Sequence, residues 1–360
     1  MNRRDILLEH ITREQRGIEI GPYHSPIAPK REGYRCLSLD VFDAATLRQK
    51  AAADPLIPRS SVAAIEDVDL EGSSTEIAEL VLAANPPGSF DYVISSHNLE
   101  HMPDPVRFLA GCGSVLRPGG LLVLAVPDRR ACFDYFRPFS TLAELLAAHA
   151  EQRTRPTPAQ TFAQASVFCR SVSGSVESYA WPVGTDPATI QPVETLEESY
   201  AAWRDQIARS DTEYRDTHCW TFTPASFELV VRDLRFLGLI DLEIDEVTGT
   251  FGHEFFVRMT NRGPLRPTPE LRAAHYAERA LLLRRTIAEA SGDPDDLGSD
   301  RHPNPRSASA LALEAMRNSW SWRLTAPARR TLDLLRRAKV FLLGSTRRVL
   351  PRDRDARPPG

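Results

Sequence analysis

The stretch Gly17-Ile-Glu-Ile-Gly21, read together with Asp40, constrains the fold of this chain more than any other feature. An apolar run ends in a glycine that begins a turn. A second apolar run, Cys36 to Leu39, follows and ends in an acid. This layout is typical of a βαβ nucleotide site. There, backbone approaches a ligand at the end of the first strand, and a carboxylate after the second strand accepts hydrogen bonds from a ribose diol.

The loop after Gly21 argues against a dinucleotide as that ligand. A dinucleotide site needs the pattern G-x-G-x-x-G, so that backbone packs against a pyrophosphate. Here Gly21 is followed by Pro22-Tyr-His-Ser-Pro26, without a second or third glycine, and the two prolines remove amide donors that a phosphate requires. The loop suits a nucleoside without phosphates, and S-adenosylmethionine is such a ligand.

Two longer motifs carry a family resemblance. The run Phe90-Asp-Tyr-Val-Ile-Ser-Ser-His-Asn-Leu-Glu-His-Met-Pro-Asp-Pro105 is followed by Val115-Leu-Arg-Pro-Gly-Gly-Leu-Leu-Val-Leu-Ala-Val-Pro-Asp128. Over roughly residues 15 to 260 the chain resembles the class I S-adenosylmethionine-dependent methyltransferases. Segments 18–27 and 126–134 resemble a subgroup associated with bacterial surface-polysaccharide and small-molecule pathways. The resemblance implies a Rossmann-like fold with S-adenosylmethionine as cofactor.

Apolar spacing predicts alternating strands and helices, hence an α/β fold with a doubly wound sheet. Expected strands are residues 17–20, 35–39, 62–68, 91–95 and 121–126, and expected helices are residues 5–16, 46–53, 74–84 and 105–116. Two further strands, 240–247 and 254–260, flank a short segment with two glycines and suit a hairpin. The resemblance implies that this hairpin forms an antiparallel edge of a seven-stranded sheet.

The rest of the chain suggests additions to this domain. We expect a methyltransferase domain over residues 1–262, with a cap insertion at about 139–217, because an ordinary connection there needs only a few residues beyond its helix. Thr268-Pro269 predicts the start of a helix, within a helical extension over 263–292. Residues 293–310 read as a disordered linker, and 311–360 as a basic amphipathic tail.

The predicted cofactor site follows the strand ends. Glu19 lies inside an apolar strand and needs a partner, which a water-mediated contact to the ligand's amino group would supply. Asp40 is placed to bind the ribose. The expected third strand ends near Asp67 and Asp69, and we favour Asp69 as acceptor for the adenine amino group. The other expected cofactor residues, all at strand ends, are Ile20, Gly21, Pro22, Ser96 and His97.

Histidines are the candidate bases. His97 and His101 are four residues apart and are expected to share a helix face, with Glu100 between them. The order His-Asn-Leu-Glu-His differs from the zinc pattern H-E-x-x-H, so no metal is expected. We take His101 as the first candidate for the catalytic base and His218 as the second. Each has a structural alternative, as a packed helix start or a helix anchor.

Candidate substrate residues follow the fifth strand and the cap. They are Asp128, Arg129, Asp134 and Trp220, at positions where the methyltransferase resemblance implies substrate contacts. For the charged residues the alternative is a salt-bridged surface loop. For Trp220 the alternative is a place in the core.

Composition limits the partners and the compartment. The net charge of −4 gives no global reason to expect nucleic acid. Five cysteines without paired spacing suggest reduced thiols in a cytoplasm. Between Arg317 and Arg357 lie twelve Arg or Lys and three Asp, interleaved with apolar residues. Such a tail is either solvated or contacts the inner face of an anionic membrane.

The sequence thus predicts an S-adenosylmethionine-dependent methyltransferase. Methylation of an oxygen needs a base, for which histidine is suited at neutral pH. The leading hypothesis is therefore O-methylation of a sugar, glycan or small metabolite. Two alternatives are a nitrogen or carbon acceptor on a small molecule, and a non-catalytic scaffold with this fold.

Overall fold

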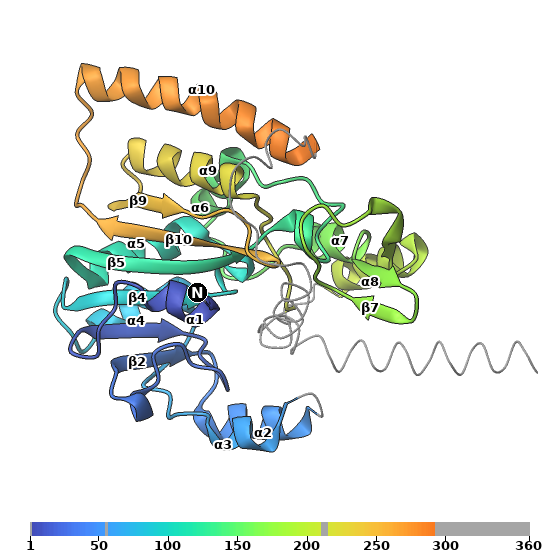
Figure 1. Ribbon diagram of the computed structural model, residues 1–360, viewed down its shortest axis with the longest axis horizontal. Coiled ribbons are helices and arrows are strands. Elements are labelled where there is room, and N and C mark those ends of the chain that lie inside the picture. The colour runs from blue at the N-terminus through green and yellow to red at the C-terminus, as the bar shows by residue number, and fades with distance from the viewer. Residues whose placement is uncertain (1, 55–56, 210–214, 292–360) are drawn as a thin grey trace, which may run out of the picture.

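The computed structural model describes residues 2–54, 57–209 and 215–291. A seven-stranded sheet forms the centre of the molecule (Figure 1). The strand order is β3-β2-β1-β4-β5-β10-β9, with β1 to β5 parallel and β10 antiparallel to both β5 and β9. The strands are β1 Arg16–Ile20, β2 Arg35–Asp40, β3 Leu70–Glu71, β4 Phe90–Ser96, β5 Leu116–Pro127, β9 Leu242–Val247 and β10 Glu254–Asn261.

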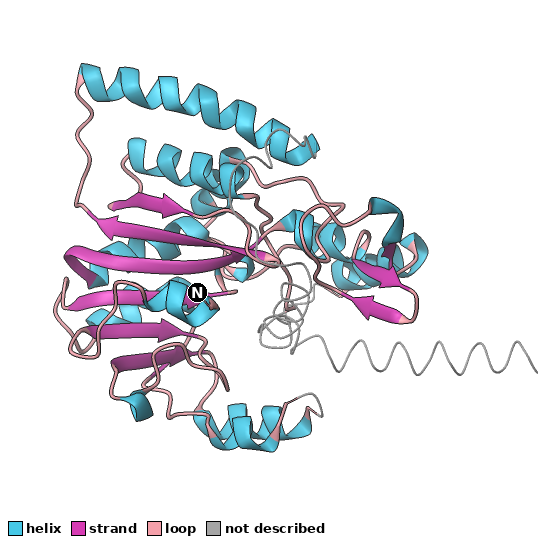
Figure 2. Ribbon diagram, in the orientation of Figure 1, coloured by secondary structure: helices cyan, strands magenta, loops and turns pink. Residues whose placement is uncertain are grey.

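Helices cover both faces of this sheet (Figure 2). The larger core lies on one face, where apolar side chains of α4, α5, α6 and α9 pack against the sheet. On the other face α1 packs over β4, β5 and β10. The helices are α1 Arg3–Leu8, α2 Ala44–Ala53, α3 Arg59–Ala63, α4 Ile77–Leu82, α5 Pro105–Val115, α6 Leu142–Ala150, α7 Pro158–Ala165, α8 Leu196–Ala208, α9 Pro224–Phe236 and α10 Pro269–Ser291.

The predicted fold class is confirmed. Parallel β1 to β5, with an added antiparallel hairpin of β9 and β10, form a Rossmann-like α/β fold of the expected kind. From Leu122 to Val126 every residue of β5 is buried, as expected for a strand covered on both faces. Because the strand order reverses between β1 and β4, a crevice opens at the carboxyl ends of these two strands.

Two expected elements are wrong. The strand expected at 62–68 is not formed. Pro58 instead precedes the short helix α3, and Val62 and Ile65 pack with Leu47 and Ala51 of α2. The strand in this part of the chain is β3, at Leu70–Glu71. The helix expected at 5–16 is also shorter, because α1 ends at Leu8.

The insertion after β5 forms a unit of its own, to the right of the main sheet in Figure 1. It contains α7, α8 and a small antiparallel sheet in the order β7-β6-β8, made of β6 Cys169–Ser173, β7 Val176–Ser178 and β8 Ile190–Pro192. Helix α6 lies within the expected cap range, but its residues Leu145 and Ala148 belong to the main core. Gln164 of α7 accepts a hydrogen bond from the backbone of His218, which joins the insertion to the segment before α9.

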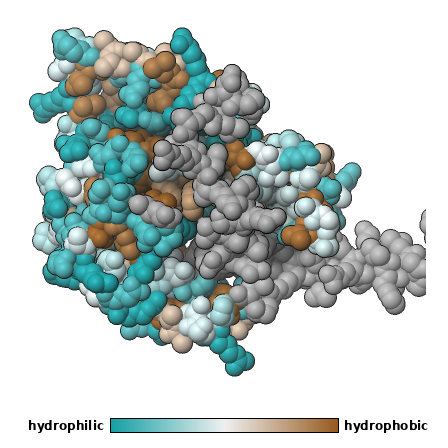
Figure 3. All heavy atoms as spheres, in the orientation of Figure 1, coloured by the Kyte–Doolittle hydropathy of each residue, from teal (hydrophilic) through white to brown (hydrophobic). Residues whose placement is uncertain are grey.

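Helix α10 matches the helix expected after Thr268-Pro269 and packs along α9. The His275 ring stacks on Phe236 with centroids 3.9 Å apart, and Arg279 pairs with Asp233 at 2.9 Å. Hydrophobic side chains remain exposed on α10, among the hydrophilic ones that cover much of this face (Figure 3). In the described part of the chain no helix is long and apolar enough to cross a membrane. The expected linker (293–310) and tail (311–360) lie outside the described residues.

Gly17 provides a direct test of this packing. A Cβ atom at Gly17 would lie 2.0 Å from the ring of buried Tyr92, whereas one at Gly113 in α5 would meet only ordinary contacts from 3.6 Å. We therefore expect Gly17→Ala to lower the free energy of unfolding by roughly 1–3 kcal/mol through overpacking. Gly113→Ala should leave it unchanged or raise it slightly. Urea unfolding followed by circular dichroism compares the two, and equal stability of both variants would contradict the packing around β1.

Candidate functional site

A pocket of about 320 Å³ lies at the carboxyl ends of β1, β2, β3 and β4. This is where ligands bind in open α/β sheets, and the volume lies in the usual range for ligand sites. Most of the residues that line it come from the four strand ends or the turns that follow them, among them Ile20, Gly21, Asp40, Gly72, Ser96 and His97. Thr154, after α6, also lines the pocket.

Gly21 and Asp40 give the pocket its two most distinctive features. Gly21 has a φ of 60°, a left-handed conformation that favours glycine, and no atom lies within 4 Å of the place a Cβ would occupy. Asp40 is buried. Its Oδ1 accepts a hydrogen bond from the Phe42 amide at 3.3 Å, but its Oδ2 has no partner. Burial raises the pKa of Asp40 to about 7.

Glu19 holds the loop that follows β1. Its two carboxylate oxygens accept hydrogen bonds from the Ile27 and Ala28 amides, at 2.7 and 2.9 Å. Burial raises the pKa of Glu19 to about 7, against the lowering effect of these two hydrogen bonds. The partner that the sequence required for this acid is therefore the loop backbone, and Glu19 does not line the pocket.

His97 follows β4 in an unusual conformation. Its φ of 49° is left-handed, which is uncommon for a residue other than glycine and occurs where surrounding contacts fix the backbone. Its Nε2 lies 2.7 Å from Glu254 on β10, and Arg3 of α1 donates to the same carboxylate at 2.7 Å. Burial alone would lower the pKa of His97, but Glu100 and Glu254 together raise it to about 9. The shared helix face expected for His97 and His101 is wrong, because only Leu99–His101 are helical.

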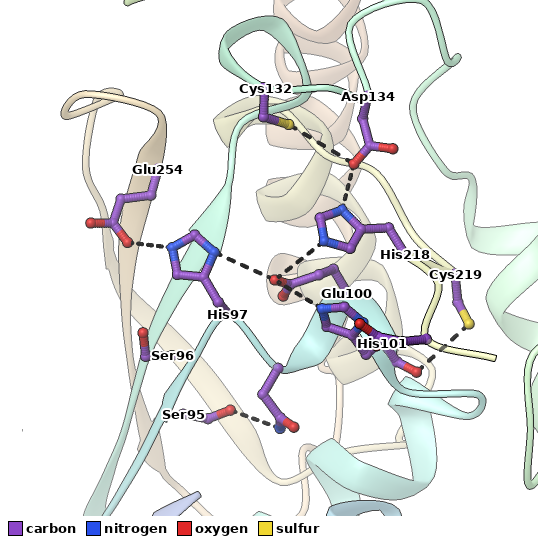
Figure 4. A network of polar contacts seen from close by, with 12 residues as sticks. Ser95, Ser96, His97, Glu100, His101, Cys132, Asp134, His218, Cys219 and Glu254 are labelled. Carbon is purple, nitrogen blue, oxygen red and sulfur yellow. Dashed lines mark hydrogen bonds and ion pairs between the residues drawn. The ribbon is translucent and has the colours of Figure 1, made fainter. Parts of the chain in front are cut away.

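Glu100 lies at the centre of a buried group of histidines (Figure 4). Its Oε1 is 3.5 Å from His97 Nδ1, 3.8 Å from His101 Nε2 and 4.0 Å from His218 Nε2. Burial would raise the pKa of Glu100, but the three imidazoles lower it. The rings of His101 and His218 meet edge to face, with centroids 4.6 Å apart. His101 also lines the pocket, so this group borders it.

Each of these two histidines is backed by a carboxylate. His218 Nδ1 is hydrogen-bonded to Asp134, which Arg137 also pairs at 2.8 Å. Burial would raise the pKa of Asp134, but His218 and Arg137 lower it to about 2. His101 Nδ1 lies 2.9 Å from Asp216, an ion-pair distance without the alignment of a hydrogen bond. The asparagine variant of Asp134 would leave Arg137 and His218 without their countercharge.

Besides Glu19, Asp134 and His218, five residues predicted for the site lie outside the pocket lining. Asp69 accepts from the Ser38 amide at 2.7 Å and pairs with Lys30, so it supports β2. Trp220 is buried in the core and donates to the Met102 carbonyl. Asp128, Arg129 and Pro22 do not line the pocket. Asp128 pairs with Arg130, and the Arg129 guanidinium donates to the carbonyls of Tyr135 and Arg137.

A comparison with known families decides which class of protein this architecture serves. The sequence profile of the methyltransferase domain family matches residues 3–235, well over half of the chain. The chain belongs to the methyltransferase domain family. Membership of this family agrees with the expectation of S-adenosylmethionine as cofactor.

Individual relatives of this methyltransferase match shorter stretches. Ubiquinone biosynthesis O-methyltransferase of Xanthomonas campestris pv. campestris (strain B100) is 50% identical over 48 residues, which are 13% of this chain and 20% of that protein. The enzyme of the same name from Ralstonia nicotianae is 43% identical over 56 residues, 16% of this chain and 24% of that protein. The chain thus spans only about a fifth to a quarter of these relatives' length.

Solved structures show broad but distant likeness. A S-adenosylmethionine-dependent methyltransferase from Aquifex aeolicus has 10% identity and a TM-score of 0.35, covering 72% of this chain and 90% of that one. One from Mesorhizobium loti has 13% identity and a TM-score of 0.36, covering 71% and 97%.

The pocket of this methyltransferase fits the cofactor. The unpartnered Oδ2 of Asp40 is a buried acceptor, which a ribose hydroxyl would satisfy. The open space beside Gly21 leaves room for a ligand close to the backbone. The two prolines that follow Gly21, Pro22 and Pro26, remove amide donors that a phosphate would need, in agreement with a methyl donor that carries no phosphate.

Asp216 and Glu254 are among the residues of the site that the sequence did not predict. They pair with His101 and His97 respectively, across long stretches of chain. No local pattern signals either pairing. The sequence offered one general clue, that a buried histidine needs a hydrogen-bond or ion-pair partner.

Asp134 tests the buried charges. We expect Asp134→Asn to lower the free energy of unfolding by roughly 3–5 kcal/mol at pH 7, because it leaves Arg137 and His218 buried without a countercharge. The folded pKa of about 2 is below the ordinary 3.8, so Asp134 stabilises the fold above pH 4 and this contribution is lost as the pH falls through 2. Urea titrations at several pH values measure both effects. Asp67→Asn, at a side chain 87% exposed, should change stability little. An equally small effect at Asp134 would contradict the network.

Proposed function

We propose that this methyltransferase transfers a methyl group to a hydroxyl oxygen of a small-molecule acceptor, most directly a sugar, a glycan or a small metabolite. One observation carries the proposal. A buried pair of histidines, each backed by a carboxylate, borders the cofactor pocket through His101. An amine acceptor would use its own lone pair and needs no such group, whereas a hydroxyl, with a pKa far above neutral, does.

The cofactor is held by the strand ends in this proposal. Asp40 accepts hydrogen bonds from the ribose diol, Ile20 and Gly21 let the ligand approach the backbone, and Ser96 and His97 form the wall after β4. Glu19 acts on the ligand only through the loop that it fixes. Pro22 and Asp69 are left out, because neither lines the pocket.

The chain's part in the transfer is to align the acceptor and to activate its hydroxyl. S-adenosylmethionine supplies a methyl group on a sulfonium, which leaves without protonation. Positioning therefore provides much of the rate enhancement. We assign activation of the hydroxyl to His101, whose orientation Asp216 supports, with His218 and Asp134 behind it.

Two observations support the acceptor class. The relatives with local identity are named O-methyltransferases, which favours oxygen as the acceptor atom. The sequence resemblance to the polysaccharide-associated subgroup favours a sugar or glycan.

Five free cysteines, all buried, favour a reducing cytoplasm. The basic tail, at the inner face of a membrane, would bring the enzyme to lipid-linked acceptors.

The acceptor is found by transfer of labelled methyl groups. Purified enzyme and labelled S-adenosylmethionine are incubated with sugar nucleotides, lipid-linked glycans and hydroxylated metabolites, with the matching amines as a second set. Labelled methyl ethers are expected. Transfer to amines alone would contradict the proposal.

The pKa of Asp40 makes cofactor binding depend on pH. With a pKa of about 7, Asp40 is mostly protonated at pH 6 and mostly ionised at pH 8. We expect S-adenosylhomocysteine to bind about tenfold more tightly at pH 8 than at pH 6, because the ionised carboxylate is the better acceptor for the ribose.

Calorimetric titration of the wild type and two variants checks this expectation. Asp40→Asn should weaken binding at pH 8 and remove most of the pH dependence. Asp69→Asn, outside the pocket lining, should keep both. If the Asp69 variant loses affinity for S-adenosylhomocysteine while the Asp40 variant keeps it, Asp40 does not make the ribose contact.

Substitution of His101 tests whether this residue activates the acceptor hydroxyl without contributing to cofactor binding. We expect His101→Gln to lower kcat on a hydroxyl acceptor by roughly 10²–10⁴-fold, as for loss of an activating group. The Kd of S-adenosylhomocysteine should change only a few-fold. His10→Gln, at an exposed histidine, serves as control and should keep full turnover. Normal turnover of the His101 variant would exclude the role assigned to this residue.

A further inference from the structure

We propose that Glu100, His101 and His218 form a binding site for one divalent transition-metal ion, with zinc as the first candidate. We refer to these three residues as the Glu100 cluster. One potential ligand atom from each residue lies within 4.8 Å of the others, and all three residues are buried, with 0%, 3% and 2% of their surface exposed.

The cluster contains more unpartnered polar atoms than a buried site normally tolerates. Both carboxylate oxygens of Glu100 and the Nε2 atoms of His101 and His218 lack a hydrogen-bond partner. They face one another at 3.8 and 4.0 Å, too far apart for hydrogen bonds. Buried polar atoms are costly unless they are satisfied, and a cation between them would satisfy all three residues at once.

Carboxylates behind the histidines orient them as metal ligands. Asp134 is bonded to Nδ1 of His218, and Asp216 lies 2.9 Å from Nδ1 of His101. In His218 the hydrogen bond to Asp134 holds the proton on Nδ1 and leaves the lone pair on Nε2. In both rings Nε2 is the atom nearer Glu100. Metal-bound histidines in proteins are commonly held by a carboxylate in this manner.

The geometry suits an ion after a small contraction. Zinc binds imidazole nitrogen at about 2.0–2.1 Å, so ligand atoms around a tetrahedral ion lie roughly 3.3–3.4 Å apart. The atoms of the cluster must therefore approach by roughly 0.5–1.5 Å, within the reach of side-chain rotation. Two imidazoles and one carboxylate form a ligand set that zinc accepts.

Three protein ligands leave one coordination position open, as in catalytic zinc sites. His101 lines the pocket, so this position would be accessible from the cofactor side. The local order of residues 97–101 predicted no metal. That expectation did not include His218, which the segment before α9 brings beside His101.

The catalytic consequence rests on the proposed function. An acceptor hydroxyl at the open position would lose its proton to water at lower pH, because the cation stabilises the alkoxide. The oxygen then forms its bond to the methyl carbon as the carbon–sulfur bond breaks and the sulfonium becomes a thioether. In this refinement His101 activates the hydroxyl by holding the ion.

Metal binding is tested without turnover. The full chain is treated with a chelator, dialysed and reloaded with zinc. Elemental mass spectrometry then gives the number of zinc ions bound per chain. One zinc per chain is expected. Cobalt loading should give the visible absorption of a four-coordinate ion with nitrogen and oxygen ligands. Absence of bound metal and of this spectrum would overturn the proposal.

Variants assign the site. His218→Ala and Glu100→Gln should each weaken zinc binding at least tenfold, while His10→Ala should bind as the wild type does. Circular dichroism identifies folded samples, and the cobalt spectrum of the wild type gives a result independent of the variants. Zinc binding unchanged in folded variants would overturn the assignment.

S-adenosylhomocysteine titration of the same samples separates this proposal from the proposed function. Cofactor binding and methyl transfer without metal would leave the function standing and remove the metal. Metal binding without cofactor binding would leave the metal site standing and contradict the proposed function.

Discussion

The burial of Glu100 is the constraint on which the rest of the site depends. A carboxylate with none of its surface exposed is costly to hold in the interior, and here three histidines surround it. They come from three segments: the end of β4, the short helix after it, and the segment before α9. Each histidine has its own carboxylate partner, Glu254, Asp216 or Asp134. The fold therefore brings four separate stretches of chain to one point: residues 97–101, residue 134, residues 216–218 and residue 254.

This arrangement joins two functions at the same edge of the sheet. The donor pocket is built from the ends of β1 to β4, with Asp40 and Gly21 as its most specific features. In the Glu100 cluster, Glu100 and His101 follow β4, and His218 follows the insertion. His97 and His101 connect the pocket with the cluster, since both line the pocket and both lie within 4 Å of Glu100. An acceptor at this junction would meet the methyl group and its activating residues together.

The sequence predicted what local patterns determine, and it failed where distant contacts decide. The strand ends at Gly21 and Asp40 follow from apolar runs that stop at a turn, so their place in the pocket was predictable. Asp69 was expected after the third strand, but that strand forms at Leu70–Glu71, and the Asp69 carboxylate supports β2 outside the pocket lining. Trp220 lies in the core and not in the pocket lining, where its indole N–H donates a hydrogen bond to the Met102 carbonyl. Asp216 lies far from His101 in the sequence, and only the folded chain brings them together.

A crystal structure of the full chain with S-adenosylhomocysteine tests the central claim most directly, because it locates the cofactor and the buried cluster in one experiment. The account predicts ribose oxygens within hydrogen-bonding distance of Asp40 and a sulfur atom on the His101 side of the pocket. A ligand bound elsewhere, or a ribose held by other residues while Asp40 Oδ2 stays unpartnered, would contradict it.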